Sequence, residues 1–112
     1  MSNKKLGQRD IEDILSELRN GLQDRYKDRF VSLILYGSYA RSDAGEGSDI
    51  DVAVVLKGEV APGREIDNML DLITDLNLKY NTLISVYPVS EVALHSVRSP
   101  LLLNIQREGI NL

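Results

Sequence analysis

A Gly-Ser pair, followed after ten further residues by Asp-Ile-Asp, is the segment that most constrains this chain. The pair is Gly37-Ser38, and the acidic residues are Asp49 and Asp51. Side chains of a strand alternate between its two faces, so the two aspartates are expected on one face, two residues apart. A turn beside two carboxylates that point the same way suits a nucleotide and a divalent cation.

Two predicted strands flank this motif. Residues 30–36 (FVSLILY) are apolar and rich in β-branched side chains, which fits a strand buried on at least one face. Gly37 ends this strand, because glycine adopts backbone angles that other residues avoid. Residues 38–41 are then expected to open a short helix. Every second residue of 50–56 is apolar, which predicts a second strand that begins beside the aspartates.

A short helix at this position would bind phosphate. Its first N–H groups have no partner inside the helix and carry positive partial charge. The Ser38 hydroxyl can donate a further hydrogen bond, and Arg41 can add a formal positive charge. We therefore assign Gly37, Ser38 and Arg41 to the triphosphate of a nucleotide.

The two aspartates are assigned to a metal ion and to catalysis. Magnesium is typically bound by a few carboxylate oxygens together with substrate phosphate and water, so Asp49 and Asp51 suffice as protein ligands. The alternative is an ordinary turn followed by solvated acids. With background frequencies of roughly 7% for Gly and Ser and about 5% for Asp, the spacing arises by chance in about one chain of this length in a thousand.

The segment GSYARSDAGEGSDIDVAVV, residues 37–55, resembles the signature of the DNA polymerase beta-like nucleotidyltransferases, and specifically of the minimal nucleotidyltransferase (MNT) branch. The resemblance implies an α+β, two-layer fold with a mixed β-sheet and helices packed on one face. It also implies transfer of AMP from ATP, with Mg²⁺ as cofactor. Many minimal members are antitoxins that attach AMP to a tyrosine of a HEPN-domain ribonuclease toxin and silence it.

Length and composition fit a small cytoplasmic enzyme. A chain of 112 residues is expected to form a single domain, residues 1–112, so the acceptor of AMP must bring its own binding surface. The net charge of −4 argues against nonspecific binding to nucleic acid. Cysteine is absent, and the amino terminus has no apolar signal segment, which excludes disulfides and indicates a cytoplasmic protein without membrane attachment.

The rest of the chain predicts supporting structure. Asp10 is expected to cap a first helix that reaches about Tyr26. A second helix is expected over 64–78, a third strand over 83–87, a short helix over 90–96 and a last helix from Ser99-Pro100 to Gly109. The expected buried positions of the second helix are Ile66, Met69, Leu70, Ile73 and Leu76.

One departure from the family pattern concerns the third strand. Active relatives usually carry a third carboxylate there, whereas this strand reads LISVY, with Ser85 about where the acid would stand. Glu91 is a weaker candidate for that role. His95, the only histidine, fits a structural or surface role better than general-base catalysis, and Tyr39 could stack on a base.

Three functions remain open at this stage. The first is an antitoxin enzyme that transfers AMP to a tyrosine hydroxyl of a HEPN toxin in a hetero-oligomer. The second is a binding protein that neutralises the toxin by occlusion, favoured by the missing third acid. The third is a nucleotidyltransferase subunit that acts on a small molecule.

Overall fold

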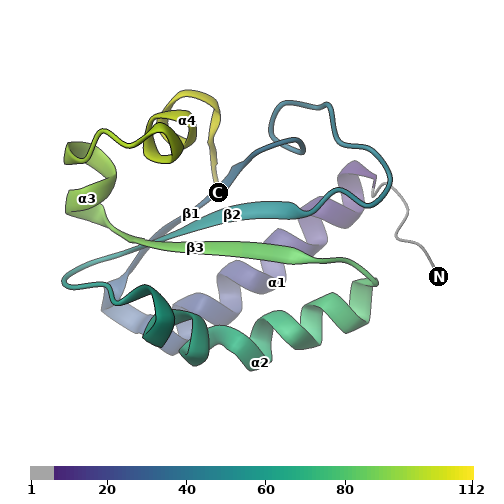
Figure 1. Cartoon of the computed structure of the whole chain (residues 1–112). Coiled ribbons are helices and arrows are strands. Elements are labelled where there is room, and N and C mark those ends of the chain that lie inside the picture. Colours follow the sequence, from purple (N-terminus) through teal and green to yellow (C-terminus); the bar gives the residue numbers. More distant parts are fainter. Residues whose placement is uncertain (1–6) are drawn as a thin grey trace.

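A four-stranded sheet organises the structure, a computed structural model that describes residues 7–112 (Figure 1). The strands follow the order β3-β2-β1-β4 across the sheet. The helices are α1 (Gln8–Tyr26), α2 (Pro62–Tyr80), α3 (Glu91–Ser96) and α4 (Pro100–Glu108), with a 3-10 turn η1 (Lys27–Arg29) after α1. The strands are β1 (Phe30–Tyr36), β2 (Ile50–Leu56), β3 (Ile84–Ser90) and β4 (Ile110–Asn111).

The sheet is mixed. β1 runs antiparallel to both β2 and β4, whereas β2 and β3 are parallel and are joined by α2. The register places Tyr36 of β1 and Ser85 of β3 on either side of Asp51 in β2. The end of β1 and the starts of β2 and β3 therefore meet at one end of the sheet. The predicted α+β fold with a mixed sheet is confirmed.

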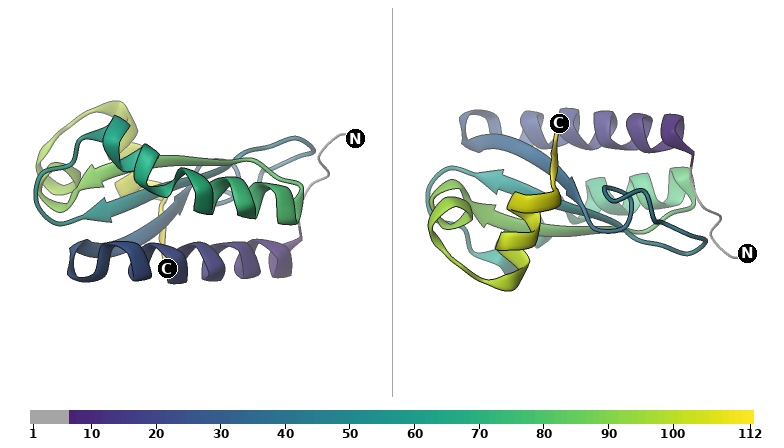
Figure 2. Two further views of the ribbon diagram at one scale, coloured as in Figure 1. Left: turned by 90° about the horizontal axis from the view of Figure 1, so that it is seen from below. Right: turned by 90° about the horizontal axis from the view of Figure 1, so that it is seen from above.

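The two long helices lie side by side under one face of the sheet, as Figure 2 shows. Their apolar stripes pack against Leu33, Leu35 and alternate residues of β2, which gives the main core. Gly21 lets α1 pass close to α2, because a Cβ there would lie 2.7 Å from the Leu72 methyl groups. The buried residues of the helices are Ile11, Ile14, Leu15, Leu18, Leu22, Tyr26, Glu65, Met69, Ile73 and Leu76.

The opposite face of the sheet is partly covered by α3 and α4. Leu94 of α3 and Leu102 and Ile105 of α4 pack with Ile34 and Val55 in a second, smaller core. The prediction that helices pack on one face thus holds for the two long helices and is wrong for these two short ones. Figure 1 places α3 at the end of the sheet remote from the loop that joins β1 to β2.

Helix boundaries show where the sequence prediction differs. α1 begins at Gln8 with Gly7 as its N-cap, so Asp10 is not the N-cap but lies in the first turn, where its carboxylate accepts a 3.3 Å hydrogen bond from the Gly7 N–H. In α2, Ile66 and Leu70 are 36% and 54% exposed, so they do not belong to the predicted buried stripe. Glu65 is buried in their place.

Glu65 forms a closed polar network at the end of the sheet where β1 begins. Its carboxylate accepts a 3.0 Å hydrogen bond from the Tyr26 hydroxyl and lies 3.5 Å from Arg29, although the Glu65 side chain is only 1% exposed. Arg29 directly precedes β1, and Gly37 directly follows it. The two ends of β1 therefore carry two different polar sites.

Within residues 7–112, no helix has the length and apolar character needed to span a membrane.

Candidate functional site

The chain turns sharply after β1. The N–H groups of Ala40 and Arg41 both donate to the Gly37 carbonyl at 3.1 Å, and the Asp43 N–H donates to the Ser38 carbonyl at 3.0 Å. Ser42 has a φ of +62°, and this left-handed residue stops the turn as a helix C-terminal motif does. The predicted short helix over 38–41 is therefore wrong, because the chain closes on itself after one turn.

Ser38 keeps donors that no protein group uses. Its hydroxyl and its N–H have no hydrogen-bond partner within residues 7–112, and the residue is half-buried. Both groups can donate to an anion at the end of β1. An anion at this position would therefore be bound by the Ser38 donors of a tight turn and not by the start of a helix.

Gly37 packs directly against Asp51. Its φ is +77°, and a Cβ at this position would overlap the Asp51 Oδ2 atom. A residue with a side chain would be strained by the backbone angle and would also push the carboxylate aside. The Gly-Ser turn and the second aspartate of the motif, which are separated in sequence, are therefore in contact.

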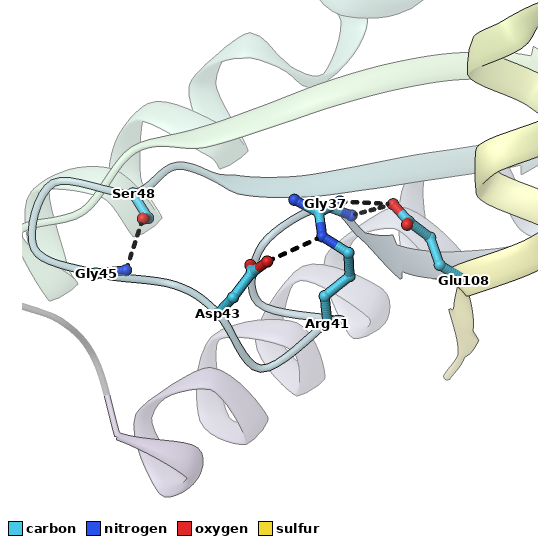
Figure 3. A network of polar contacts seen from close by, with 6 residues as sticks. All are labelled: Gly37, Arg41, Asp43, Gly45, Ser48 and Glu108. Carbon is cyan, nitrogen blue, oxygen red and sulfur yellow. Dashed lines mark hydrogen bonds and ion pairs between the residues drawn. The ribbon is translucent and has the colours of Figure 1, made fainter.

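The two aspartates occupy the start of β2. In the tight turn just before Asp49, the Gly45 N–H donates to the Ser48 Oγ at 2.9 Å, and Figure 3 shows this hydrogen bond. Asp49 is exposed and Asp51 is half-buried, and neither carboxylate has a hydrogen bond or ion pair within residues 7–112. Burial, and then the charge of Asp49, raise the pKa of the Asp51 carboxyl, while Arg41 lowers it.

This pair of acids fits a divalent cation held partly by its substrate. A bound cation would offset the repulsion between Asp49 and Asp51, and both carboxylates are free to act as ligands. Residues 7–112 contain no group of three or more His, Cys, Asp or Glu side chains placed to hold a metal. The remaining ligands would therefore be phosphate oxygens and water.

Arg41 is held by two carboxylates of the chain itself. Its Nε donates to Asp43 at 3.2 Å, and its Nη1 donates to the Glu108 Oε1 at 3.0 Å (Figure 3). Asp43 and then Glu108 raise the pKa of the guanidinium. Sequence reasoning assigned Arg41 to phosphate and missed Glu108, which lies at the end of α4 and has no motif that links it to the turn.

The residues beside Asp51 form one row across three strands. Tyr36 and Ser85 are its register neighbours, and Ser85 is exposed. Ser85, the position where the family resemblance led us to expect a third acid, is thus the register neighbour of Asp51. Burial, followed by Asp51 and Tyr87, raises the pKa of the Tyr36 hydroxyl.

Two weaker candidates lie away from this row. Glu91 begins α3 after Ser90, whose register partner is Leu56 at the opposite end of β2 from Asp51, so Glu91 cannot replace the third acid. His95 lies on the same helix and is exposed, as expected for a surface role.

A cavity of about 500 Å³ lies behind the turn. Tyr39, Ala40 and Ser42 line it together with α1 residues and Leu35, whose side chain faces the main core. Neither aspartate lines this cavity. Tyr39 therefore faces the α1 side of the turn, whereas Asp51 stands on the other face of the sheet.

The fold and the paired acids define a class of protein that comparison confirms. The chain belongs to the nucleotidyltransferase domain family, whose members match it over residues 15–100. It is thus a nucleotidyltransferase, as the sequence motif predicted.

Two relatives come from Methanocaldococcus jannaschii, and both bear the name putative protein adenylyltransferase. One is 41% identical over 80 residues, which cover 71% of this chain and 74% of the relative. The other is 36% identical over 76 residues, which cover 68% of this chain and 76% of the relative.

Two solved structures share the fold. A chain from a toxin–antitoxin crystallised with AMP-PNP aligns with a TM-score of 0.55 and 20% identity, over 95% of this chain and 72% of that one. A chain from a mutant of the toxin–antitoxin MntA–HpeT aligns with a TM-score of 0.56 and 16% identity, over 95% and 71%.

Proposed function

We propose that this nucleotidyltransferase is an antitoxin that transfers AMP from ATP to a tyrosine hydroxyl of a HEPN-type ribonuclease toxin and thereby neutralises it. The observation that carries the proposal is the pair Asp49 and Asp51. Neither carboxylate has a hydrogen bond or ion pair within residues 7–112, and Asp51 lies against a turn whose Ser38 donors are also unused. The names of the relatives support a protein acceptor, and the solved structures support a toxin partner.

The site residues have separate roles in this proposal. Asp49 and Asp51 would hold Mg²⁺, which when bound neutralises phosphate charge. Ser38 donates to phosphate oxygens through its hydroxyl and N–H. Gly37 allows the turn to lie against Asp51, and Arg41 supplies positive charge to the triphosphate.

The transfer itself exchanges one phosphorus–oxygen bond for another. The acceptor oxygen forms a bond to the α-phosphorus of ATP, and the bond between that phosphorus and the oxygen bridging to the β-phosphate breaks. Pyrophosphate leaves, and the hydroxyl proton passes to solvent. The chain contributes mainly position and charge, which suffice for much of the acceleration of phosphoryl-type transfer.

The acceptor can reach the row Tyr36, Asp51 and Ser85 from the face of the sheet that carries α3 and α4. Figure 1 places α3 at the far end of this face, and Ser85 is exposed. A tyrosine on a protein surface can therefore approach the site without a further domain of this chain. This accessibility supports a hetero-oligomer with the toxin.

Intact mass of the partner tests the proposal. The partner is incubated with this protein, ATP and magnesium, in parallel with the double variant Asp49→Asn/Asp51→Asn. We expect mass gains in steps of one AMP with the wild-type protein and none with the double variant. Labelling by the double variant would contradict the assignment of the two acids.

A second candidate function is neutralisation by binding alone. It is favoured by the metal site, which within residues 7–112 has two carboxylates and Ser85 beside them. If the double variant still protects cells from the toxin and forms a stable complex, occlusion is the mechanism. The variant Ser85→Asp separates the two candidates further. If the protein is an enzyme, a third acid beside Asp51 should raise the rate of AMP transfer, whereas a protein that acts by binding alone should show no transfer with either residue.

A further inference from the structure

Glu108 connects the last helix to the nucleotide turn. Its Oε1 atom accepts hydrogen bonds from the Gly37 N–H at 3.2 Å and from the Arg41 Nη1 at 3.0 Å (Figure 3). The Glu108 side chain is 23% exposed, against 47% for Arg41. A single carboxylate oxygen, 67 residues away from Arg41 in sequence, therefore joins two groups of the motif.

The tight junction between α4 and β4 places Glu108 at this position. Gly109 follows it, and its N–H donates to the Ile105 carbonyl at 2.9 Å. A Cβ on Gly109 would overlap both that carbonyl and Ile34. Ile110 then pairs with Leu35, so β4 starts within two residues of the end of α4. The backbone around Glu108 is therefore fixed by α4 before it and by β4 after it.

The Gly37 N–H faces β4 and not the aspartates. Leu33 accepts a hydrogen bond from the Leu112 N–H, and Leu35 pairs with Ile110, so odd-numbered residues of β1 direct their backbone groups to β4. Gly37 continues this alternation, so its N–H points toward β4. The Glu108 carboxylate accepts this hydrogen bond in place of a backbone carbonyl of β4. The carboxylate thus occupies a donor on the side of the turn away from β2.

Arg41 keeps donors for a ligand after both contacts are made. A guanidinium has five N–H donors in a fixed plane, and Asp43 and Glu108 use one on Nε and one on Nη1. Nη2 has no partner within residues 7–112. Two carboxylates therefore fix the orientation of the plane and leave one edge open.

We propose that Glu108 is a positioning residue of the nucleotide site, which holds Arg41 beside the Gly37-Ser38 turn with Nη2 open to a phosphate oxygen of ATP. This inference rests on the proposed function, since it assigns Arg41 to the triphosphate. Glu108 itself touches no substrate. Its effect reaches the nucleotide through Arg41.

Binding of Mg-ATP to the full chain, measured by isothermal titration calorimetry, tests this role in a double-variant cycle. We expect Glu108→Ala to weaken binding roughly tenfold, as loss of an oriented charge-assisted contact does. Glu108→Gln should recover part of the loss, because its amide oxygen still accepts from Gly37. In an Arg41→Lys background, where the planar fork is absent, Glu108→Ala should have little further effect.

Steady-state transfer to the partner gives a second readout. An interaction made equally with bound ATP and with the transition state raises KM and leaves kcat near the wild-type value, so Glu108→Ala should show this split. Asp67→Asn is the matched control, because it removes one exposed carboxylate on α2 that has no hydrogen bond or ion pair within residues 7–112. Thermal unfolding of each variant fixes a temperature at which all are folded.

Three outcomes would overturn the inference. Tighter binding in Glu108→Ala would mean that the carboxylate competes with phosphate. An equal loss in the wild-type and Arg41→Lys backgrounds would mean that Glu108 acts on the fold, and unchanged binding would mean that it does not position Arg41. In all three cases the wild-type chain binds Mg-ATP, whereas absence of wild-type binding would defeat the proposed function as well.

Discussion

Two carboxylates at opposite ends of the sheet have opposite surroundings. Glu65 is 1% exposed and is satisfied by Tyr26 and Arg29, so each of its interactions lies inside the chain. Asp51 is half-buried beside a second acid, and no group within residues 7–112 donates to it or pairs with it. The more deeply buried acid is the one with partners.

This difference separates structure from function on physical grounds. A buried charge is tolerated when hydrogen bonds and an opposite charge replace water, as at Glu65. At Asp51 burial and Asp49 raise the pKa of the carboxyl, so the ionised form lowers the stability of the folded state at neutral pH. Asp51 thus lowers folding stability and keeps carboxylate oxygens without a protein partner. These oxygens are available to a ligand from outside the chain.

The largest expected effect is on transfer by Asp51→Asn. Loss of a carboxylate proposed to hold the charge-neutralising cation should lower the rate about a thousandfold, equivalent to about 4 kcal/mol. The free energy of unfolding should be unchanged or higher, because an ionised group with a raised pKa is removed. Rates of AMP transfer and urea unfolding at neutral pH measure the two quantities, and a large loss of stability would break the comparison.

The reverse pattern is expected for Glu65→Ala. Tyr26 and Arg29 would lose their shared partner, which should lower the free energy of unfolding by about 3 kcal/mol. Transfer by the folded protein should stay near the wild-type rate, since the network lies at the other end of β1. Asp67→Ala, on an exposed site of the same helix, is the control and should change stability by less than about 0.5 kcal/mol.

A pair of glycine variants sharpens the assignment of the turn. Gly37 and Gly47 both have a φ of +77°, so substitution by alanine strains each backbone by about 1 kcal/mol. A Cβ at Gly37 would overlap Asp51, whereas at Gly47 it would meet no described atom within 4 Å. Transfer rates should therefore fall in Gly37→Ala and stay close to wild type in Gly47→Ala. Equal rates would show that Asp51 tolerates displacement.

The smallest effect concerns alkaline pH. Burial, and then the hydrogen bond to Glu65, raise the pKa of the Tyr26 hydroxyl from its ordinary value to about 12. The protonated phenol is thus favoured in the folded state, so its contribution is complete below pH 10 and is lost as the pH rises toward 12. Urea unfolding across this range should show a steeper loss for wild type than for Tyr26→Phe. Parallel curves would contradict the shift.

The sequence was informative where local pattern determines structure. The two strands around the motif, the long helices and the fold class follow from apolar periodicity and a short signature. The motif predicted a turn beside the two aspartates without specifying a contact. The structure shows that Gly37 lies directly against Asp51.

Long-range contacts were outside the reach of such patterns. Glu108 belongs to a helix whose apolar spacing does not indicate the turn that it contacts. Glu65 is buried in α2, although it is not among the apolar positions predicted to be buried there. Ile66 and Leu70 fit helical spacing, but the packing of α2 buries the adjacent stripe. The prediction of a short helix after Gly37 was wrong because Ser42 has a positive φ, which a serine in the sequence does not indicate.

The proposed metal ligands and the Gly-Ser turn all belong to one antiparallel β1–loop–β2 unit, residues 30–56. Substitutions on α2, α3 or the exposed part of β3 can therefore change the surface that contacts an acceptor protein, while the proposed metal ligands and the Gly-Ser turn stay unchanged. Lineages that keep this segment can exchange one target for another by remodelling surfaces that carry no chemistry, which is how one fold comes to serve many substrates.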